Sequence, residues 1–327
     1  MSREHNAHRP VASIRVLQQR ASLLSEIRGY FAHRGVLEVE TPLLSSSANP
    51  DAAIEPMQSG YRQPGSHRSQ TLYLHTSPEF PMKRLLAAGS GSIFQICHTF
   101  RNGECGRLHN PEFTLLEWYR IDFDHFQLMD EVDALLIQLL PGCAAAERYR
   151  YADLFVTHTG LDLFSASPAQ LRQRAESAGV VIPESAETGW LIEVLFELCV
   201  GSWLKQQQGV IVYDYPAAQA SLSQLSTQDS RLAERFEYYF QGMELANGFH
   251  ELADAAEQRQ RFEAENSKRR QSGSEILPLD EHFLQALEDG LPDCSGVALG
   301  IDRLLMLRCG VDHIEEVLAF PFARNDE

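Results

Sequence analysis

The feature that most constrains the fold is a series of strand patterns separated by hairpin-length loops, with the predicted helices in separate blocks. Residues 93–100 and 113–120 are predicted strands joined by a loop that contains Gly and Asn, and residues 235–252 are predicted to form two strands around Gln241-Gly242. A two-residue turn joins antiparallel strands, whereas parallel strands need a crossover of a dozen or more residues. The sequence therefore predicts an α+β fold with a mainly antiparallel sheet flanked by helices.

The other segments are predicted helices, short strands and one long loop. Apolar residues recur at helical spacing in residues 13–33, and we expect further helices at 79–88, 125–140, 255–271 and 280–289. Short strands are expected at 36–41, 72–76 and 210–216, and a glycine-rich strand-to-helix junction at 295–308. Residues 45–70, rich in Ser, Asn, Pro, Gly and Gln, are predicted to be loop.

Length and composition predict one large domain. Of the 327 residues, 44% are apolar, which is enough for a substantial core. Residues 1–12 are polar, without the apolar segment of a secretory signal, and we expect a short disordered lead-in. Residues 13–327 then form a single domain, with a mostly helical insertion at about 147–207.

Charge and cysteine content narrow the function classes. The chain has 28 Lys and Arg against 45 Asp and Glu, a net charge of −17, which does not favour bulk attraction to nucleic acid. The basic run Lys268-Arg269-Arg270 is predicted to be a solvated helix face. The six cysteines form no CxxC and are predicted to be reduced cytosolic thiols. No apolar run is long enough to span a membrane, and neither a phosphate-binding P-loop nor a dinucleotide fingerprint is present.

The first candidate site begins where the strand at 93–100 ends. Phe100-Arg101-Asn102-Gly103-Glu104 is followed by His109-Asn110-Pro111-Glu112-Phe113 and then by Glu117-Trp118-Tyr119. The strand period of two puts Phe113, Leu115, Glu117 and Tyr119 on one face, and two aromatics with a carboxylate suit a ligand site better than a core. Arg101 can hold a phosphate through paired donors, and His109 and Phe113 can stack on a purine. The alternative is a surface strand with an ordinary ion pair.

The second candidate site is the strand pair from Phe236 to Glu251. A two-residue turn at Gln241-Gly242 pairs Phe240 with Met243 and Tyr239 with Glu244, and it puts Glu237 opposite Ala246. Glu237 and Glu244 then share a face as diagonal neighbours, about 7–8 Å apart, where they can hold Mg²⁺ together with ATP phosphates.

Two further features of this strand pair bear on a ligand. Asn247-Gly248 interrupts the alternation and can re-aim Phe249 and Glu251, and a buried Glu251 would need a partner such as a substrate ammonium. The alternative is a solvent-facing edge with scattered acidic residues.

The third candidate is the glycine-rich run Ser295-Gly296-Val297-Ala298-Leu299-Gly300-Ile301-Asp302-Arg303. Small residues let the backbone approach a ligand, and the run leads into a helix that carries Arg303. An arginine there can stack on adenine or bind the γ-phosphate, although such a run is a weak signal by itself.

Taken together, the three runs resemble the signature motifs of class II aminoacyl-tRNA synthetases, in the same order. Gly35 to Pro42 resembles motif 1, the dimerisation element, Phe100 to Phe113 resembles motif 2, and Gly296 to Arg303 resembles motif 3. Thr76-Ser77-Pro78-Glu79, Arg107 to Glu117, and Glu244 to Glu251 are similar to the lysyl-tRNA synthetase branch. The resemblance extends from about residue 13 to residue 320, and it implies a class II synthetase-type catalytic domain.

The sequence departs from lysyl-tRNA synthetases in three ways. The catalytic domain starts near residue 13, which leaves no room for their anticodon-binding domain. Ala298 stands where they carry Gly, and the added methyl can disfavour α-lysine and suit an amino group shifted by one carbon. Both departures resemble the stand-alone paralogues that attach (R)-β-lysine to a lysine ε-amine of translation elongation factor P. Thirdly, Gly103 fills a position where motif 2 usually has Glu, and Glu104 is the candidate to replace it.

The resemblance implies a role for each candidate residue. For ATP it implies Arg101, Asn102, Gly103, Glu104, His109, Asn110, Phe113, Glu244, Leu245, Gly300 and Arg303, with Arg101 and Arg303 catalytic. For the amino acid it implies Ser77, Pro78, Glu79, Glu117, Tyr119, Asn247, Phe249, Glu251 and Ala298. For Mg²⁺ it implies Glu237 and Glu244.

The resulting expectation is a cytoplasmic, homodimeric, ATP-dependent ligase. It forms an acyl-adenylate from (R)-β-lysine and transfers the acyl group to elongation factor P, with tRNA disfavoured as acceptor. Two alternatives stay open, a truncated lysyl-tRNA synthetase that charges tRNA and a catalytically silent paralogue that acts as a regulatory subunit.

Overall fold

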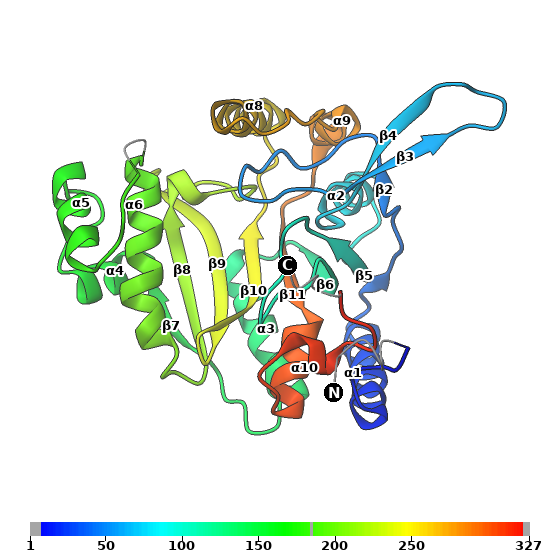
Figure 1. Ribbon diagram of the computed structural model, residues 1–327, viewed down its shortest axis with the longest axis horizontal. Coiled ribbons are helices and arrows are strands. Elements are labelled where there is room, and N and C mark those ends of the chain that lie inside the picture. Colours follow the sequence, from blue (N-terminus) through cyan, green and yellow to red (C-terminus); the bar gives the residue numbers. More distant parts are fainter. Residues whose placement is uncertain (1–7, 184–185, 323–327) are drawn as a thin grey trace. The chain divides into compact units, whose positions relative to one another are not determined.

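The computed structural model describes residues 8–183 and 186–322 (Figure 1). Contacts divide the chain into two compact units, which are described separately. The first comprises Met1–Asp122, Gln138–Pro141 and Ala253–Glu327, and the second comprises Phe123–Ile137 and Gly142–Leu252. The single catalytic domain implied by the resemblance stays a prediction.

The first unit is built on a four-stranded arrangement in which β5 pairs with β1 in parallel and with β6 in antiparallel orientation, and β6 pairs with β11 in antiparallel orientation. Its helices are α1 (Ile14–Ala32), α2 (Glu79–Ala87), α8 (Ala255–Ser272), α9 (Glu281–Gly290), α10 (Ile301–Cys309) and the 3₁₀ turn η4 (Ile314–Val317). Its main strands are β1 (Leu37–Glu38), β5 (Ile93–Phe100), β6 (Glu112–Ile121) and β11 (Cys294–Gly300). The helices expected in this unit are confirmed, but only two residues of the strand expected at 36–41 pair.

Helix α1 contacts β5 and β6 through Phe31. It begins after Ser13, whose hydroxyl accepts a hydrogen bond from the Val16 amide at 3.3 Å. Phe31, near its end, stacks on Phe94 with ring centroids 4.6 Å apart and lies 5.4 Å from the Trp118 ring. The apolar side chains of this face leave the opposite face of the same strands for polar groups.

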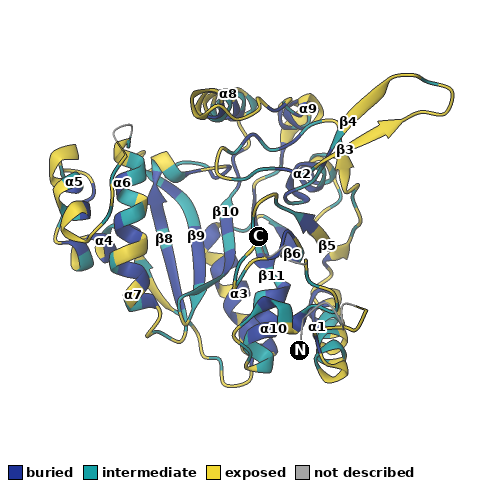
Figure 2. Ribbon diagram, in the orientation of Figure 1, coloured by how far each residue is buried: buried dark blue, intermediate teal, exposed yellow. Residues whose placement is uncertain are grey.

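Residues 45–70 were predicted to be loop, but the structure contains strands there. They contribute to a small antiparallel sheet of order β2–β4–β3, made of Leu44–Ser45, Ser69–Leu74 and Gln58–Arg62. The prediction failed because β3 is exposed at every residue and the first three of the six residues of β4 are exposed, so the strands show no apolar alternation (Figure 2).

The basic run in α8 is only partly a solvated face, which corrects a second prediction. The Arg269 side chain is 1% exposed, forms an ion pair with Glu55 and donates from Nε to the Glu275 carbonyl at 2.6 Å. It therefore joins three segments of the first unit, while Lys268 forms a surface ion pair with Glu265.

The second unit has strands in the order β10–β9–β8–β7, antiparallel except for the parallel β7–β8 pair. These strands are β7 (Glu147–Arg150), β8 (Val210–Pro216), β9 (Leu232–Phe240) and β10 (Met243–His250). Its helical elements are α3 (His125–Leu139), α4 (Tyr151–Thr159), α5 (Pro168–Ser177), α6 (Thr188–Leu195), the π-helix η2 (Phe196–Val200), α7 (Gly201–Leu204) and the 3₁₀ turn η3 (Ala217–Gln219).

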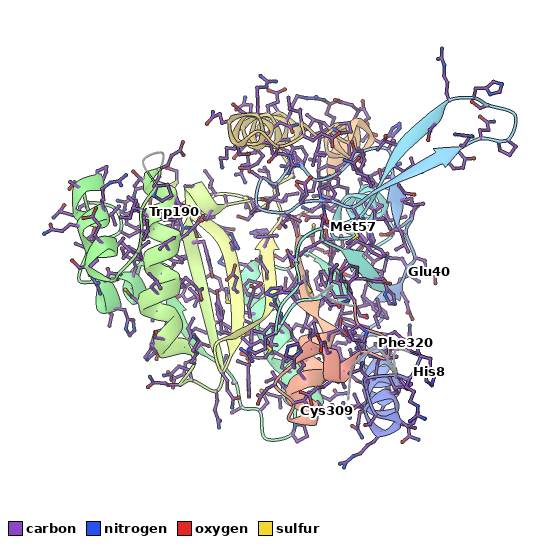
Figure 3. The ribbon with its side chains drawn as sticks, viewed as in Figure 1. His8, Glu40, Met57, Trp190, Cys309 and Phe320 are labelled. Atoms are coloured by element: carbon purple, nitrogen blue, oxygen red, sulfur yellow. The ribbon has the colours of Figure 1, made fainter. Side chains whose placement is uncertain are left out.

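Residues 147–207 are mostly helical, as expected, although they open with the strand β7. Their buried side chains form one cluster with those of β8, and Trp190, labelled in Figure 3, packs against it. In the same cluster Tyr151 stacks on Phe196, with centroids 4.0 Å apart. The segment therefore belongs to the core of the second unit.

Candidate active site

The polar face of the first unit is formed by alternate residues of β5, β6 and β11. Pairing sets Thr99 opposite Phe113 and Gln95 opposite Glu117. On the other side of β6, Ala298 is opposite Glu117. The predicted face of Phe113, Leu115, Glu117 and Tyr119 is confirmed by this register, since partners across a strand pair share a face.

Glu117 lies at the centre of this face and is 3% exposed. Its Oε1 accepts a hydrogen bond from the Tyr119 hydroxyl at 2.6 Å. Burial, followed by the charge of Glu117, raises the pKa of the Cys97 thiol to about 12. A buried carboxylate beside the half-buried Ala298 is suited to an ammonium group.

Gln95 is a candidate that sequence reasoning missed. It is 2% exposed, and its Oε1 has no hydrogen-bond partner among the described residues. Its position beside Glu117 follows from the β5–β6 register, which the sequence does not give until the two strands are aligned. An amide oxygen here adds an acceptor to the polar face.

Arg101 follows β5 directly, and its backbone amide is anchored on the Pro111 carbonyl at 2.9 Å. The guanidinium lies 5.1 Å from the centre of the Phe113 ring and 3.6 Å from a carboxylate oxygen of Glu104. Its Nε is buried without a hydrogen-bond partner among the described residues. Arg101 therefore has an N–H donor available for an anion.

The Arg101 loop turns at Gly103, whose φ of 80° is a left-handed conformation that favours glycine. This backbone geometry gives a reason for glycine where motif 2 usually has Glu. Glu104, the next residue, has a carboxylate oxygen 3.6 Å from the Arg101 guanidinium. Asn102, in the same loop, is fixed through its amide to the Glu55 carbonyl at 2.8 Å.

His109 and Arg303 are in direct contact, while their expected place around adenine stays a prediction. Arg303 Nη2 donates to His109 Nε2 at 2.7 Å. Burial, followed by the charge of Arg303, lowers the His109 pKa below its usual 6.5, so the imidazole is a neutral acceptor. A Cβ added at Gly300 would be in ordinary van der Waals contact with the Arg303 side chain, at 3.8 Å.

Asn110 is buried, and its side chain is already engaged. Its amide donates to the Glu112 carbonyl at 2.6 Å, and its Oδ1 accepts from the Phe322 amide at 2.9 Å. The side chain thus fixes the end of the loop to a segment near the C-terminus, and a contact with the nucleotide stays a prediction.

The predicted residues Ser77, Pro78 and Glu79 form the start of α2. The Glu79 amide donates to the Ser77 hydroxyl at 3.3 Å, and Pro78 is the cap residue. Glu79 Oε1 accepts from Lys83 at 2.6 Å, and Lys83 is 1% exposed. Their spacing of four residues could have indicated this ion pair from the sequence.

In the second unit, the turn at Gln241-Gly242 is confirmed. Both residues have positive φ, 50° and 74°, and Phe240 pairs with Met243 and Tyr239 with Glu244. The register beyond this point was predicted wrongly. An irregularity between Glu244 and Ala246 shifts β10, so the partner of Glu237 is Asn247 instead of Ala246. The break also lies earlier than Asn247-Gly248, where it was expected.

Glu237 is 7% exposed and accepts hydrogen bonds from Arg235 and from the Tyr239 hydroxyl. Burial, followed by the charges of Glu237 and Glu244, raises the Tyr239 pKa well above its usual range. Both carboxylates therefore interact electrostatically with Tyr239. The Oδ1 of Asn247, opposite Glu237, is buried without a hydrogen-bond partner among the described residues. These groups present oxygen ligands on one face of the hairpin.

Phe249, Glu251 and Leu245 complete the predicted set in this unit. Phe249 is opposite Arg235, with its ring centre 5.8 Å from the guanidinium. Glu251 is 5% exposed, and its backbone forms an isolated antiparallel β-bridge with Ser223. Leu245 is 2% exposed, so its side chain serves packing, and only its backbone is available to a ligand.

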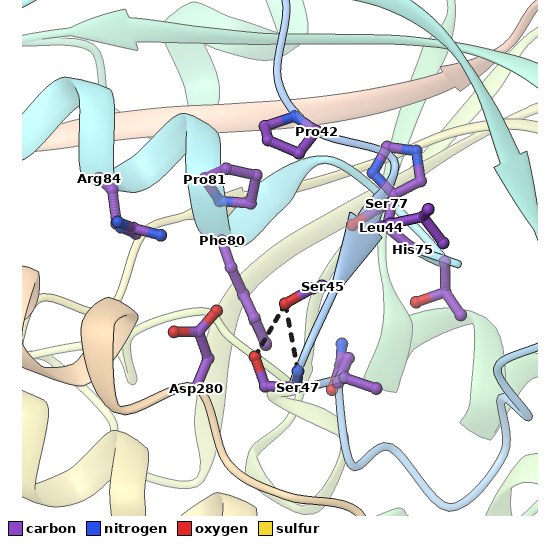
Figure 4. A pocket seen from close by; sticks show the side chains of 13 residues that line it. Pro42, Leu44, Ser45, Ser47, His75, Ser77, Phe80, Pro81, Arg84 and Asp280 are labelled. Atoms are coloured by element: carbon purple, nitrogen blue, oxygen red, sulfur yellow. Dashed lines mark hydrogen bonds between the residues drawn. The ribbon is translucent and has the colours of Figure 1, made fainter. Parts of the chain in front are cut away.

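A pocket of about 140 Å³ opens beside Ser77 in the first unit (Figure 4). Its wall includes Phe80, Arg84 and Asp280, and one side is closed by Ser45 and Ser47, whose hydroxyls are 3.0 Å apart. Ser77 is the one predicted site residue that lines it. None of Gln95, Glu117, Tyr119 and Ala298 is among the residues that line it.

These motifs and strands define a class of protein, and the family comparison agrees. The model of the class II tRNA synthetases (D, K and N) matches residues 5–324. The chain belongs to this family, and the predicted family and fold class are confirmed.

Within this family, the chain is similar to one group of curated relatives. The chain is 51% identical over 317 residues to the elongation factor P–(R)-β-lysine ligase of Edwardsiella ictaluri, covering 96% of this chain and 97% of the relative. It is 48% identical over 323 residues to the ligase of the same name from Vibrio atlanticus, covering 98% and 100%. For the ligase of that name from Vibrio cholerae, the identity is 50% over 317 residues, covering 96% and 98%. Separately, no helix of the described residues is long and apolar enough to cross a membrane.

Proposed function

We propose that this chain is an ATP-dependent ligase that activates (R)-β-lysine and transfers it to the ε-amine of a lysine on elongation factor P. The full-length similarity to ligases of that name supports the proposal. The observation that carries it is the register of β6 and β11, which sets Ala298 beside Glu117. There the methyl group can disfavour α-lysine and suit an amino group shifted by one carbon.

For the nucleotide, the residues of the first unit supply cations and a stacking surface. Arg101 has the donor geometry to hold the α-phosphate, and its proximity to Phe113 places charge beside an aromatic ring. The neutral His109, fixed by Arg303, presents a flat surface to adenine. Glu104, beside Arg101, is the candidate for recognition of the base in place of the residue missing at Gly103.

For the metal, the residues of the second unit fit Mg²⁺. Magnesium prefers oxygen ligands and is usually bound by one or two carboxylates with phosphates and water. Glu237 and Glu244 act on one cluster, and Arg235 and Tyr239 orient the Glu237 carboxylate while further lone pairs remain. Bound there, the ion would neutralise phosphate charge.

For the amino acid, Glu117, Tyr119 and Glu251 are proposed to bind the side-chain ammonium. Both carboxylates are buried, at 3% and 5% exposure. Ser77, Pro78, Glu79, Asn247 and Phe249 are proposed to surround the remaining groups of the substrate.

The chemistry follows from positioning and charge. In the first step, an oxygen of the substrate carboxylate attacks the α-phosphorus, the bond to the β-phosphate oxygen breaks, and pyrophosphate leaves. In the second, the acceptor amine attacks the acyl carbon, AMP leaves with the electrons of the C–O bond, and the amine loses a proton to solvent. Arg101 and Arg303 stabilise the charge that develops on phosphate, as preorganised donors do in other displacements.

The proposal includes a cytoplasmic location, because the acceptor is a translation factor, and a homodimer. Around the motif 1 resemblance, Leu37, Leu43 and Leu44 are 54%, 39% and 45% exposed. Exposed leucines in one short segment suit a protein interface.

Pyrophosphate exchange with the pure protein tests the activation step. Exchange should be fastest with (R)-β-lysine, compared with (S)-β-lysine and L-α-lysine at equal concentrations. A preference for L-α-lysine would favour a truncated synthetase. Absence of exchange with all three would favour the silent regulatory paralogue and overturn the proposal.

A further inference from the structure

A second group of possible metal-ligating side chains, apart from the Glu237 cluster, lies on the β9–β10 hairpin and at the start of α3. His250 follows Phe249, and neighbouring residues of a strand point to opposite faces. Its Nδ1 is 2.6 Å from Oε2 of Glu234, which also accepts from Gln224 Nε2 at 3.2 Å. His125, the first residue of α3, brings its Nδ1 to 3.7 Å from the same carboxylate oxygen. All three residues belong to the second unit.

The spacing of these atoms suits a metal ion. One ligand atom from each of His125, Glu234 and His250 lies within 4.8 Å of the other two. Tetrahedral zinc, with bonds of about 2.0–2.2 Å, holds its ligand atoms about 3.3 Å apart. The distances of 2.6 and 3.7 Å to the Glu234 oxygen lie on either side of that value, so small side-chain rotations would complete the geometry.

His125 supplies an independent sign of a missing ligand. Its side chain is 6% exposed, and neither ring nitrogen has a hydrogen-bond partner in the described part of the chain. Native proteins rarely leave both nitrogens of a buried imidazole unsatisfied.

We propose that His125, Glu234 and His250 form a binding site for a divalent transition metal of the zinc type. Two imidazoles and one carboxylate favour zinc, cobalt or nickel over magnesium. The three ligands come from α3, β9 and β10, so the ion would fix the start of α3 to the hairpin, and water would complete its coordination. The site would leave the oxygen ligands of Glu237 and Glu244 to magnesium.

Metal binding by the full-length, untagged protein tests this site. After chelation and dialysis, the protein is titrated with ZnCl₂ in excess Mg²⁺, and bound zinc and the Tm are measured. We expect about one zinc per chain and a higher Tm with zinc. His125→Asn and Glu234→Gln should weaken binding at least tenfold. His98→Asn is the control, because His98 forms an exposed pair with Glu112 in the first unit and should not affect binding.

Co²⁺ titration of the unmodified protein removes any dependence on how the variants fold. Cobalt in a site with nitrogen ligands and four-fold coordination should give visible absorption bands that zinc abolishes and Mg²⁺ does not. No zinc bound at micromolar concentration, no cobalt bands, or equal binding by folded His125→Asn and Glu234→Gln would overturn the proposal. Each of those results would make the cluster a hydrogen-bonded group bridged by water.

Discussion

Arg101 and Arg235 both stand beside a carboxylate, but their surroundings differ. Arg235 donates to Glu237 and, at 2.7 Å, to the Gln219 carbonyl, and its side chain is 16% exposed. Arg101 is 3.6 Å from the Glu104 carboxylate, a looser contact, and its side chain is 29% exposed. The Nε of both arginines lacks a hydrogen-bond partner among the described residues, so the difference lies in the other guanidinium nitrogens. The comparison teaches that residue type does not distinguish a supporting cation from a ligand-binding one, whereas the surrounding contacts do.

The largest expected effect is on stability, from Arg235→Met. This change leaves the buried Glu237 without its cation, and breaking a buried pair from one side costs about 3–5 kcal/mol. The free energy of unfolding, measured in urea, should fall by that amount. Replacing both partners, in Arg235→Met with Glu237→Leu, should restore most of it. A loss below 1 kcal/mol for the single variant would contradict the supporting role.

In contrast to Arg235→Met, Arg101→Ala should reduce activity and leave stability nearly unchanged. Because Arg101 is proposed to bind phosphate, pyrophosphate exchange should fall about 10²–10³-fold, while the unfolding free energy changes little. Arg28→Ala, which removes an exposed ion pair with Glu38, is the matched control and should leave both unchanged. If Arg101→Ala retained pyrophosphate exchange, the proposed phosphate-binding role of Arg101 would be wrong.

Ala298→Gly should change selectivity more than rate. Removing the methyl beside Glu117 should shift the ratio of kcat/KM for (R)-β-lysine over L-α-lysine toward α-lysine. A single methyl in a pocket is worth about 10–200-fold. Val297→Ala, at the neighbouring buried residue of β11, should leave that ratio unchanged. An unaltered ratio in Ala298→Gly would remove Ala298 from the specificity site.

Tyr119→Phe should have a smaller effect, confined to substrate binding. The variant loses the hydroxyl that donates to Glu117 at 2.6 Å. A hydrogen bond of about 1 kcal/mol corresponds to a KM for (R)-β-lysine about fivefold higher. The KM for ATP should not change, and a rise in that constant instead would assign Tyr119 to the nucleotide.

The smallest predicted effect is the pH dependence of the His109–Arg303 contact. The folded-state pKa of His109 lies below 6.5, so its contribution to stability is present above 6.5 and is lost as the pH falls through the lowered folded value. NMR titration should give that low pKa, and Arg303→Ala should raise it. A pKa at or above 6.5 in the unmodified protein would contradict a neutral acceptor.

Features set by local sequence were predicted correctly. Gln241-Gly242 indicated a two-residue turn because glycine tolerates positive φ, and the period of two gave the Glu117 face. The shift between Glu244 and Ala246 was misplaced because the break was assigned to Asn247-Gly248, although the adjacent apolar residues Leu245 and Ala246 already interrupt the alternation. Gln95 depended on register and the exposed β3–β4 hairpin lacked a buried face, so neither could be found from composition.

The central claim, that this family member modifies elongation factor P, is tested most directly by acyl transfer. The protein is incubated with ATP and labelled (R)-β-lysine, and with elongation factor P and tRNA together as competing acceptors. The account predicts label on a lysine of elongation factor P, dependent on Arg101, with none on tRNA. Label on tRNA, or adenylate formation without transfer to elongation factor P, would contradict it.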